Sequence, residues 1–284
     1  MKKAFSILAI SALFFTSCSS GAEEETTNST PVPMTPSTPA PSNPIPSSGR
    51  FVKNVLIEDF TGTWCGYCPR VSYAIQNVLN QNISAVPVTV HRSNGTLTDP
   101  FHFQPATPLM SQLNIVDAPT AILDRKEEWT NEVTNSNQVK NLTGLNAQLG
   151  IAMSSSIQNN TINMNVHTKF GANMSNLKLV VYVLENDLLY NQVNYTSYYG
   201  GASVIQNFDN DYVLRASLTN VLGDNITGST NTGNIYTKNF TVPVPSNISN
   251  ASKLTFVAFV LDSTGKVINV RSSAPNVTQT FQEQ

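Results

Sequence analysis

Residues 51–69 have the sequence FVKNVLIEDFTGTWCGYCP, and this stretch decides how the rest of the chain is interpreted. Its first ten residues are rich in β-branched and aromatic side chains, which predicts a half-buried to fully buried strand. Residues 70–79 place apolar side chains on one face at helical spacing and predict a helix. Cys65 and Cys68 therefore fall where a strand gives way to the first turn of a helix.

That position favours the thiolate form of a cysteine. Unpaired backbone N–H groups and the positive end of the helix dipole stabilise an anion at a helix N-terminus. We therefore expect the pKa of the Cys65 thiol to lie below the value of about 8.5 for a free cysteine. Because two residues separate the sulfurs, Cys68 can reach a mixed disulfide on Cys65 and resolve it. The spacing predicts a redox-active pair.

The composition bounds the class of protein. The chain has 284 residues, of which 40% are hydrophobic, enough for a sizeable core, and the length suggests two domains. Charged residues make up 12%, against about 25% in typical soluble domains. Asn, Ser and Thr replace the missing charge, which suits a β-rich protein outside the cytoplasm. The formal net charge is -2 and no basic stripe occurs, so we expect no binding to nucleic acid.

The first 18 residues have the pattern of a secretion signal. Lys2 and Lys3 precede an apolar segment, residues 4–15, that is too short for a stable membrane span, and a small-residue site ends in Cys18. The segment resembles a bacterial lipoprotein signal, although Phe15 departs from the usual aliphatic residue. The resemblance implies that residues 1–17 are removed and that acylated Cys18 anchors the chain in a membrane. The alternative is an ordinary secretory signal with a spare cysteine.

Residues 18–50 form a predicted tether. Seven prolines lie among Ser and Thr between residues 31 and 46, so this segment has no apolar surface to bury and should be extended. An acidic run, residues 23–25, follows the predicted lipid site. It resembles the surface-export signal of Bacteroidetes lipoproteins, and the equally weighted alternative is a set of merely solvating charges.

The number and spacing of the cysteines limit the kinds of site that they can form. With Cys18 assigned to lipid, Cys65 and Cys68 are the remaining thiols in an oxidising compartment, and they make no general disulfide framework. The three histidines, His91, His102 and His167, are widely spaced in the sequence, so we predict no metal site and no cofactor. A transient two-sulfur copper site is the rival interpretation of the cysteine pair.

The segment from Asp59 to Cys68 resembles the active-site segment of thioredoxins, in which an acid precedes the first cysteine by six residues. Residues 118–120, Ala-Pro-Thr, resemble the cis-proline element of that family. The resemblance implies Cys65 as nucleophile, Cys68 as resolving thiol, Asp59 as proton acceptor and Pro119 as an element that binds substrate, with further substrate contacts from Trp64, Tyr67 and Ala118. Glu58 is the competing acid, because a one-residue register slip would exchange the two side chains.

The predicted fold class is an α/β thioredoxin-like domain, residues 51–149, followed by an all-β immunoglobulin-like sandwich, residues 150–284. In the first part we predict strands at 85–91 and 115–124, a short helix at 105–113 and a helix at 136–149. From residue 150 onward the hydrophobic period changes to two and predicts strands at 177–184, 235–242, 254–261 and 267–270. Pro69, and the 54 residues between Cys65 and Pro119, depart from the thioredoxin pattern.

Residues 190–212 contain five of the nine tyrosines of the chain. One interpretation is a contact surface for a glycan or a protein, since rings with a polar group are common at binding surfaces. The simpler interpretation, which we favour at this point, is a long loop packed on the sandwich by its own rings.

The mature chain also resembles the twenty-eight-kilodalton outer-membrane protein family of Bacteroidetes, through residues 58–65 and 207–215. Two functions are weighed. The first is a lipid-anchored envelope thiol–disulfide oxidoreductase, of reductase or isomerase type, acting on disulfide-bearing envelope proteins or a redox partner. The second is a surface binding or adhesion lipoprotein in which the CxxC-bearing part is mainly scaffold.

Overall fold

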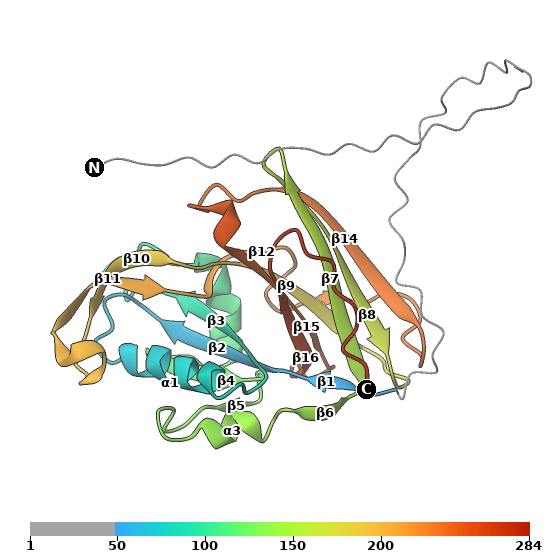
Figure 1. Cartoon of the computed structure of the whole chain (residues 1–284), viewed down its shortest axis with the longest axis horizontal. Coiled ribbons are helices and arrows are strands. Elements are labelled where there is room, and N and C mark those ends of the chain that lie inside the picture. The colour runs from blue at the N-terminus through green and yellow to red at the C-terminus, as the bar shows by residue number, and fades with distance from the viewer. Residues whose placement is uncertain (1–48) are drawn as a thin grey trace, which may run out of the picture. The chain divides into compact units, whose positions relative to one another are not determined.

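The computed structural model describes residues 49–284, apart from the side chain at position 145. The predicted signal peptide, the predicted lipidation site Cys18 and nearly all of the predicted tether lie outside these residues. The described part contains sixteen strands and three short α-helices, so it is mostly β (Figure 1). None of the helices within residues 49–284 is long and apolar enough to cross a membrane.

A nine-stranded sheet forms the centre of the fold (Figure 1). Its order is β16-β15-β9-β12-β3-β2-β4-β5, with the short β13 paired to β9. The strands are β2 (Val55–Thr61), β3 (Ala85–His91), β4 (Thr120–Leu123), β5 (Glu127–Glu128), β9 (Lys178–Glu185), β12 (Val213–Ser217), β13 (Asp224–Asn225), β15 (Leu254–Leu261) and β16 (Val267–Ser273). Within this sheet β3 pairs in parallel with β2 and with β12, and the other pairs are antiparallel.

A single β–α–β unit joins β2 to β3 through helix α1 (Pro69–Asn80). Pro69 takes the first helical position, where its missing N–H costs no hydrogen bond. Val71, Ala74, Ile75 and Val78 then recur at helical spacing and are buried against the sheet. The other helices are shorter: α2 (Thr107–Gln112), preceded by the 3₁₀ turn η1 (Gln104–Ala106), and α3 (Ser136–Lys140).

A second sheet has three antiparallel strands in the order β14-β8-β7. They are β7 (Leu149–Gln158), β8 (Thr161–Phe170) and β14 (Ile235–Pro243). Strand β8 has the two-residue period expected from residue 150 onward: Ile162, Met164 and Val166 are buried, whereas Asn163 and Asn165 face outward. The buried side chains pack against those of β9 and β15, so part of the large sheet forms a sandwich with the small one.

The hydrophobic core on the other face of the large sheet joins the two halves of the sequence. Leu56 and Val88 come from the first half, and Val180 and Phe259 come from the second. All four side chains are fully buried in one cluster. The predicted boundary at residues 149/150 therefore separates strands that share one sheet and one core.

The remaining strands lie outside these two sheets. They are β1 (Phe51–Lys53), which pairs with β6 (Gly144–Ala147), and the hairpin of β10 (Leu188–Val193) and β11 (Val204–Asn210). The 3₁₀ turn η2 (Tyr198–Gly201) connects β10 to β11, and η3 (Ala251–Lys253) precedes β15. The hairpin extends away from the large sheet, and its connection comes down beside the first turn of α1 (Figure 1).

The predicted fold class, an α/β thioredoxin-like domain followed by an immunoglobulin-like sandwich, is wrong. The described chain is mostly β, with several sheets and few helices. One reason is the predicted helix at 136–149: α3 ends at Lys140, and strands β6 and β7 occupy the residues after it. The apolar residues there repeat at three- to four-residue spacing, yet pairing of β7 with β8 prevails over that pattern.

Most other element predictions are confirmed within one or two residues. The strands predicted at 85–91 and 254–261 coincide with β3 and β15, and the predicted helix at 70–79 coincides with α1. The strand predicted at 115–124 is shorter, because β4 begins only at Thr120, after Pro119. The domain boundaries themselves stay a prediction.

Candidate functional site

Cys65 and Cys68 form a disulfide in the loop between β2 and α1, with an S–S distance of 2.06 Å. Helix α1 begins at Pro69, so Cys68 is its N-cap and Cys65 precedes the helix. The backbone N–H of Cys65 donates to the Gly62 carbonyl (2.9 Å) in a tight turn. Cys68 thus lies closer to the helix N-terminus than Cys65, which we predicted as the nucleophile.

The end of β10 and the residues directly after it cover this loop. Gln192 Nε2 donates to the carbonyls of Gly62 (3.2 Å) and Cys65 (2.9 Å). The Val193 N–H donates to the Thr63 carbonyl (2.9 Å), and the Tyr195 N–H donates to the Gly66 carbonyl (2.7 Å). Under this cover Cys65 is 4% exposed and Cys68 is 1% exposed. Access of a partner thiolate to this disulfide is therefore restricted.

Gly66 permits this close approach. A Cβ atom at position 66 would lie 2.2 Å from the nearest atom of the Tyr195 ring, well inside van der Waals contact. The Tyr195 ring also meets the Tyr67 ring edge to face, with centroids 5.6 Å apart. The glycine between the cysteines therefore has a packing role in this fold.

Asp59, the predicted proton acceptor, is fully buried in β2 on the side that faces α1. Neither carboxylate oxygen has a hydrogen-bond partner within the described residues. The pKa of Asp59 is raised to about 8, mainly by burial and then by the charge of Glu132, against the opposing charge of Arg70. Asp59 is therefore an acid that holds its proton near neutral pH, and its catalytic role stays a prediction.

Glu58, the competing acid, points to the opposite face of β2 and has a different partner. Arg125 holds its carboxylate with two hydrogen bonds of 2.9 Å, and both side chains are fully buried. The same guanidinium donates to the Tyr182 hydroxyl (2.8 Å) and lies over the Phe259 ring. Glu58 is thus part of a buried ion pair in the core, away from the cysteines.

Pro119 follows Ala118 through a cis peptide bond. Because Thr120 pairs with Phe60, Pro119 lies at the end of β2 from which the CxxC loop departs.

Trp64, a predicted substrate contact, instead donates from Nε1 to the Arg92 carbonyl (2.7 Å) and is half-buried. Tyr67 is 56% exposed beside the disulfide. Their substrate-binding roles, and that of half-buried Ala118, stay predictions.

Exposed tyrosines surround the covered disulfide. We call Tyr67, Tyr73, Tyr195 and Tyr199 the tyrosine surface; all four are at least 36% exposed. Tyr73 stacks on half-buried Tyr198 with ring centroids 4.5 Å apart and meets the Tyr199 ring edge to face. The tyrosine-rich loop therefore packs on α1 and the CxxC loop, so the interpretation that it packs on the sandwich is wrong.

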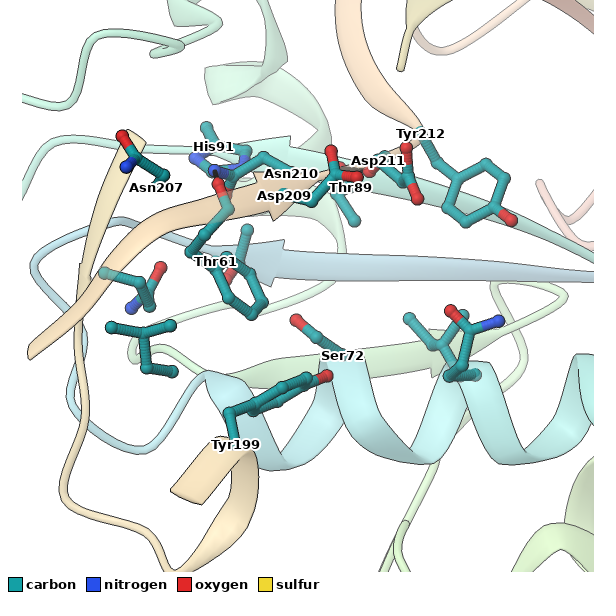
Figure 2. A pocket seen from close by; sticks show the side chains of 15 residues that line it. Thr61, Ser72, Thr89, His91, Tyr199, Asn207, Asp209, Asn210, Asp211 and Tyr212 are labelled. Atoms are coloured by element: carbon teal, nitrogen blue, oxygen red, sulfur yellow. Dashed lines mark hydrogen bonds between the residues drawn. The ribbon is translucent and has the colours of Figure 1, made fainter. Parts of the chain in front are cut away.

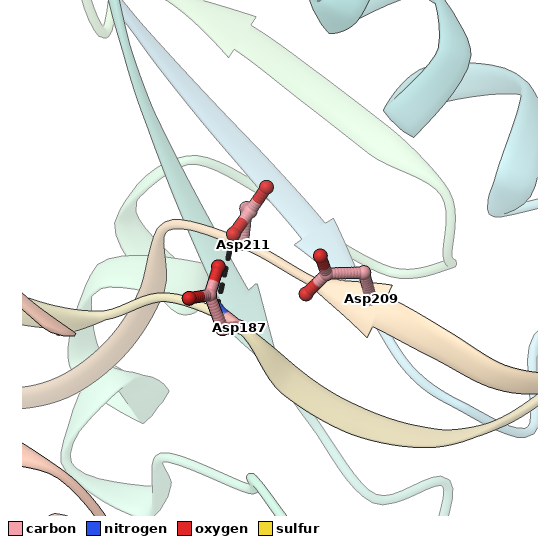
Figure 3. Close-up of side chains that lie close together, drawn as sticks. All are labelled: Asp187, Asp209 and Asp211. Atoms are coloured by element: carbon pink, nitrogen blue, oxygen red, sulfur yellow. Dashed lines mark hydrogen bonds between the residues drawn. The ribbon is translucent and has the colours of Figure 1, made fainter. Parts of the chain in front are cut away.

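Three carboxylates, Asp187, Asp209 and Asp211, lie within 4.8 Å of one another where the hairpin returns to the sheet (Figure 3). The Asp187 N–H donates to Asp211 Oδ1 (3.1 Å), and Lys253 forms an ion pair with Asp187. Partial burial and the charges of Asp211 and Asp187 raise the pKa of Asp209. Lys253 already supplies this cluster with a cation.

Each of the three histidines has a separate partner. His91 binds buried Asp99 through Nδ1 (3.1 Å), His102 contacts Ser93, and His167 contacts Thr237 on the outer face of the small sheet.

Sequence reasoning missed the residues that cover the disulfide. Gln192 lies 127 residues after Cys65, whose carbonyl it binds. Local sequence patterns do not predict a contact between residues so far apart. The available signal was the absence of charge: residues 188–208 carry no Asp, Glu, Lys or Arg. A long uncharged segment with four tyrosines is typical of a segment that packs against another surface.

Comparison with known proteins gives the family. Residues 106–279, more than half of the chain, match the family model for outer membrane protein Omp28. The chain belongs to the Omp28 family. It is accordingly a protein of the outer membrane, which confirms the predicted location in the cell envelope. The comparison with curated proteins found no match.

Two solved structures resemble this Omp28 family member. HBP35 of Porphyromonas gingivalis is 19% identical, with a TM-score of 0.59, over 81% of this chain and 79% of that one. At that identity the likeness concerns the fold. A domain of the outer membrane lipoprotein Omp28 from Porphyromonas gingivalis is 21% identical, with a TM-score of 0.31, over 47% of this chain and 100% of that one.

Proposed function

We propose that this Omp28 family member is an outer-membrane binding protein that contacts a protein partner through its tyrosine surface. In this proposal the CxxC loop is a support that holds the aromatic side chains in place. The observation that carries it is the contrast around the disulfide: both sulfurs are covered, whereas the rings of Tyr67 and Tyr195 beside them are 56% and 67% exposed.

The composition of the hairpin supports a contact role. Residues 188–208 combine tyrosines with Asn, Ser, Thr and Gly and lack charge. Tyrosine offers a large contact area at a small cost in side-chain entropy, and short polar side chains adapt their hydrogen bonds to a partner. A contact of this type depends on aromatic burial, so its affinity should change little with salt concentration.

Site-specific photocrosslinking in intact cells tests the proposal. A benzoylphenylalanine in place of exposed Ser197 should give one discrete crosslinked partner, whereas the same probe in place of Thr237, on the outer face of β14, should give none. Tyr67→Ser with Tyr195→Ser should reduce the crosslink at least fivefold. The proposal fails if these tyrosine changes leave the crosslink intact, or if raising NaCl to 0.5 M abolishes it.

Cysteine replacement separates support from chemistry. Under the binding proposal, Cys65→Ser with Cys68→Ser keeps the crosslink from position 197, because the hydrogen bonds from residues 192–195 reach backbone carbonyls. Loss of the crosslink in this double variant would contradict the support role.

Thiol–disulfide exchange is the second candidate, and buried Asp59 favours it. An unpaired carboxyl that holds a proton near neutral pH is suited to protonating a leaving thiolate. In such a step the reduced Cys65 thiolate attacks a partner disulfide, the partner S–S bond breaks, and the first partner sulfur leaves and takes a proton. Cys68, as its thiolate, then attacks Cys65 Sγ in the mixed disulfide and releases the second partner thiol, so the partner disulfide is reduced and the Cys65–Cys68 pair is oxidised by two electrons.

A trapping experiment decides this candidate. Cys68→Ala cannot resolve a mixed disulfide and should accumulate adducts on Cys65, visible as bands that dithiothreitol removes. The Cys65→Ala variant is the matched control and should accumulate fewer. Absence of adducts in cells grown under oxidising conditions would rule out exchange at this pair.

A further inference from the structure

The cavity beside the tyrosine surface belongs to the region already described. Its volume is about 340 Å³, and it lies between helix α1, the β10–β11 hairpin and the ends of β2 and β3 (Figure 2). Tyr199 of the tyrosine surface lines it, and so do Asp209 and Asp211, whose charges Lys253 already offsets. Strand β7 of the small sheet, in contrast, has an edge that a separate part of the chain covers.

Residues 276–284, which we call the C-terminal segment, run along the edge of β7 that does not pair with β8. The Ser155 N–H donates to the Val277 carbonyl (3.1 Å), and the Gln279 N–H donates to the Met153 carbonyl (2.8 Å). Bonds of this kind join neighbouring antiparallel strands in a sheet. The C-terminal segment therefore occupies the edge of β7 as an added strand would.

Side chains of the C-terminal segment make this contact specific. Gln279 Oε1 accepts from the Met153 N–H (3.2 Å), and Gln279 Nε2 donates to the Ser272 carbonyl (2.8 Å). Asn276 Oδ1 accepts from the Ile157 N–H (2.8 Å). An extended peptide without these two amide side chains would leave the Met153 and Ile157 N–H groups without these bonds. The edge of β7 therefore fits the sequence of the C-terminal segment.

Little apolar surface holds the C-terminal segment in place. None of its residues is buried, and Val277 is 39% exposed. Phe281 meets the Phe51 ring edge to face, with centroids 6.3 Å apart, and Glu283 forms an ion pair with Lys169. Segments with few buried apolar contacts open locally at a small cost in free energy. We therefore expect the C-terminal segment to leave the edge of β7 far more readily than a core strand leaves its sheet.

The hinge between β16 and the C-terminal segment is short. It consists of Ala274 and Pro275, because β16 ends at Ser273 and the bonds to β7 begin at Asn276. Pro275 has a fixed φ angle, and Asn276 has a φ of +61°, in the left-handed region, which is unfavourable for residues with a side chain. Short hinges under strain favour exchange of the attached segment between copies of a chain.

We propose that the edge of β7 binds the C-terminal segment of a second copy of this chain, so that two copies are linked by reciprocal exchange. The exchanged segment makes the same hydrogen bonds in either chain, so the exchange loses no contact. Copies in one outer membrane share a surface, which raises their effective concentration. Different elements form this edge and the tyrosine surface (Figure 1), so its test is independent of both candidate functions.

Paired cysteines test the exchange in intact cells. Ser154 of β7 lies opposite Thr278 in an antiparallel bridge, so cysteines at these two positions are close enough to form a disulfide. Differently tagged Ser154→Cys and Thr278→Cys chains, expressed together, should give a disulfide-linked heterodimer that dithiothreitol removes. The control pairs Thr278→Cys with Thr237→Cys on β14 and should give at least fivefold less heterodimer. Equal yields from the two pairs would overturn the proposal.

A chain that carries both Ser154→Cys and Thr278→Cys distinguishes exchange from a segment that stays on its own chain. Under the proposal this variant should form disulfide-linked dimers in addition to an internal disulfide. An internal disulfide alone would overturn the exchange, and the absence of both products would contradict the contact itself. Circular dichroism checks that each variant is folded.

A longer hinge tests the cause of the exchange. Insertion of Gly-Ser-Gly between Ala274 and Pro275 lets the C-terminal segment reach the edge of its own chain without strain, and it should lower the heterodimer yield at least threefold. The same insertion between Ser263 and Thr264, in the exposed turn between β15 and β16, is the control and should change the yield less than twofold. An unchanged yield with the longer hinge would contradict the proposal.

Discussion

Asp59 is a buried acid whose carboxyl group keeps its proton near neutral pH. Its carboxyl is fully buried on the side of β2 that faces α1 and has no hydrogen-bond partner among residues 49–284. Burying an ionised carboxylate is costly, so the group keeps its proton instead. The two acids of β2 thus have different environments. Glu58 forms an ion pair with Arg125, whereas the negative charge of Glu132 raises the pKa of Asp59 and Arg70 only partly offsets this rise.

We expect Asp59 to make the stability of the fold depend on pH. Its pKa rises from 3.8 to about 8 on folding, so between these values the folded state binds more protons than the unfolded state. The stabilisation is complete below pH 3.8 and is lost as the pH rises toward and through 8. Asp59→Asn should remove a slope of up to about 1.4 kcal/mol per pH unit from the free energy of unfolding. Urea unfolding at pH 5, 6, 7 and 8 measures it.

Glu132 provides the control for this pH dependence. Glu132→Gln removes a negative charge that raises the pKa of Asp59, so the pH-dependent window should end at a lower pH than in the wild type. Parallel pH profiles for the wild type and Asp59→Asn would contradict the buried, protonated state of Asp59.

The β10–β11 hairpin is the element that gives the disulfide its surroundings. Its hydrogen bonds to the CxxC loop are to backbone carbonyls, so they depend on the close approach of two chain segments. Gly66 permits that approach, because any side chain there would meet the Tyr195 ring.

Gly66→Ala should therefore detach residues 192–195 from the loop. We expect the amide of Val193, which binds the Thr63 carbonyl, to exchange with solvent at least tenfold faster. Hydrogen exchange followed by NMR measures this rate. Adding Tyr195→Ala to Gly66→Ala removes the clashing ring and should restore protection at Val193. If Gly66→Ala leaves this amide protected, Gly66 is not required for the contact.

Many individual helices and strands could be predicted from the sequence, but the contacts between distant parts of the chain could not. Helix α1 and strands β3 and β15 follow from hydrophobic periodicity, which is a local property. The resemblance to thioredoxins also singled out the CxxC loop, Asp59 and Pro119, and Pro119 lies at the end of β2 from which the loop departs. The cover over the cysteines depends on Gln192 and Tyr195, more than a hundred residues away, and such pairing leaves no periodic signal.

Residues 49–284 are organised around one large sheet, on part of which the three-stranded sheet packs. Strands from both halves of the chain share that sheet, and Leu56 and Phe259 share its core. Periodicity located many of the strands, but it assigned residues of β6 and β7 to a helix. The order of the strands also depends on the parallel pairing of β12 with β3, which involves a single pair of residues, Val213 and Thr89.

Asn269 of β16 ties the two halves together and provides the test of their cooperativity. Its Nδ2 donates to the carbonyls of Val52 (3.0 Å) and Leu149 (2.9 Å), and its Oδ1 accepts from the Asn54 N–H (3.1 Å). Asn269→Ala leaves these backbone groups without their partner and should lower the free energy of unfolding by at least about 2 kcal/mol. A shared sheet and core should make the loss appear equally in both halves.

Two probes measure this in one urea titration. Fluorescence of Trp64 and Trp129 reports on the first half, and hydrogen exchange with mass spectrometry of β8 and β14 reports on the second. We expect the two midpoints to coincide in the wild type and to shift together in Asn269→Ala. Separate midpoints would instead support the predicted division into residues 51–149 and 150–284, because independently folding domains lose structure at their own denaturant concentrations.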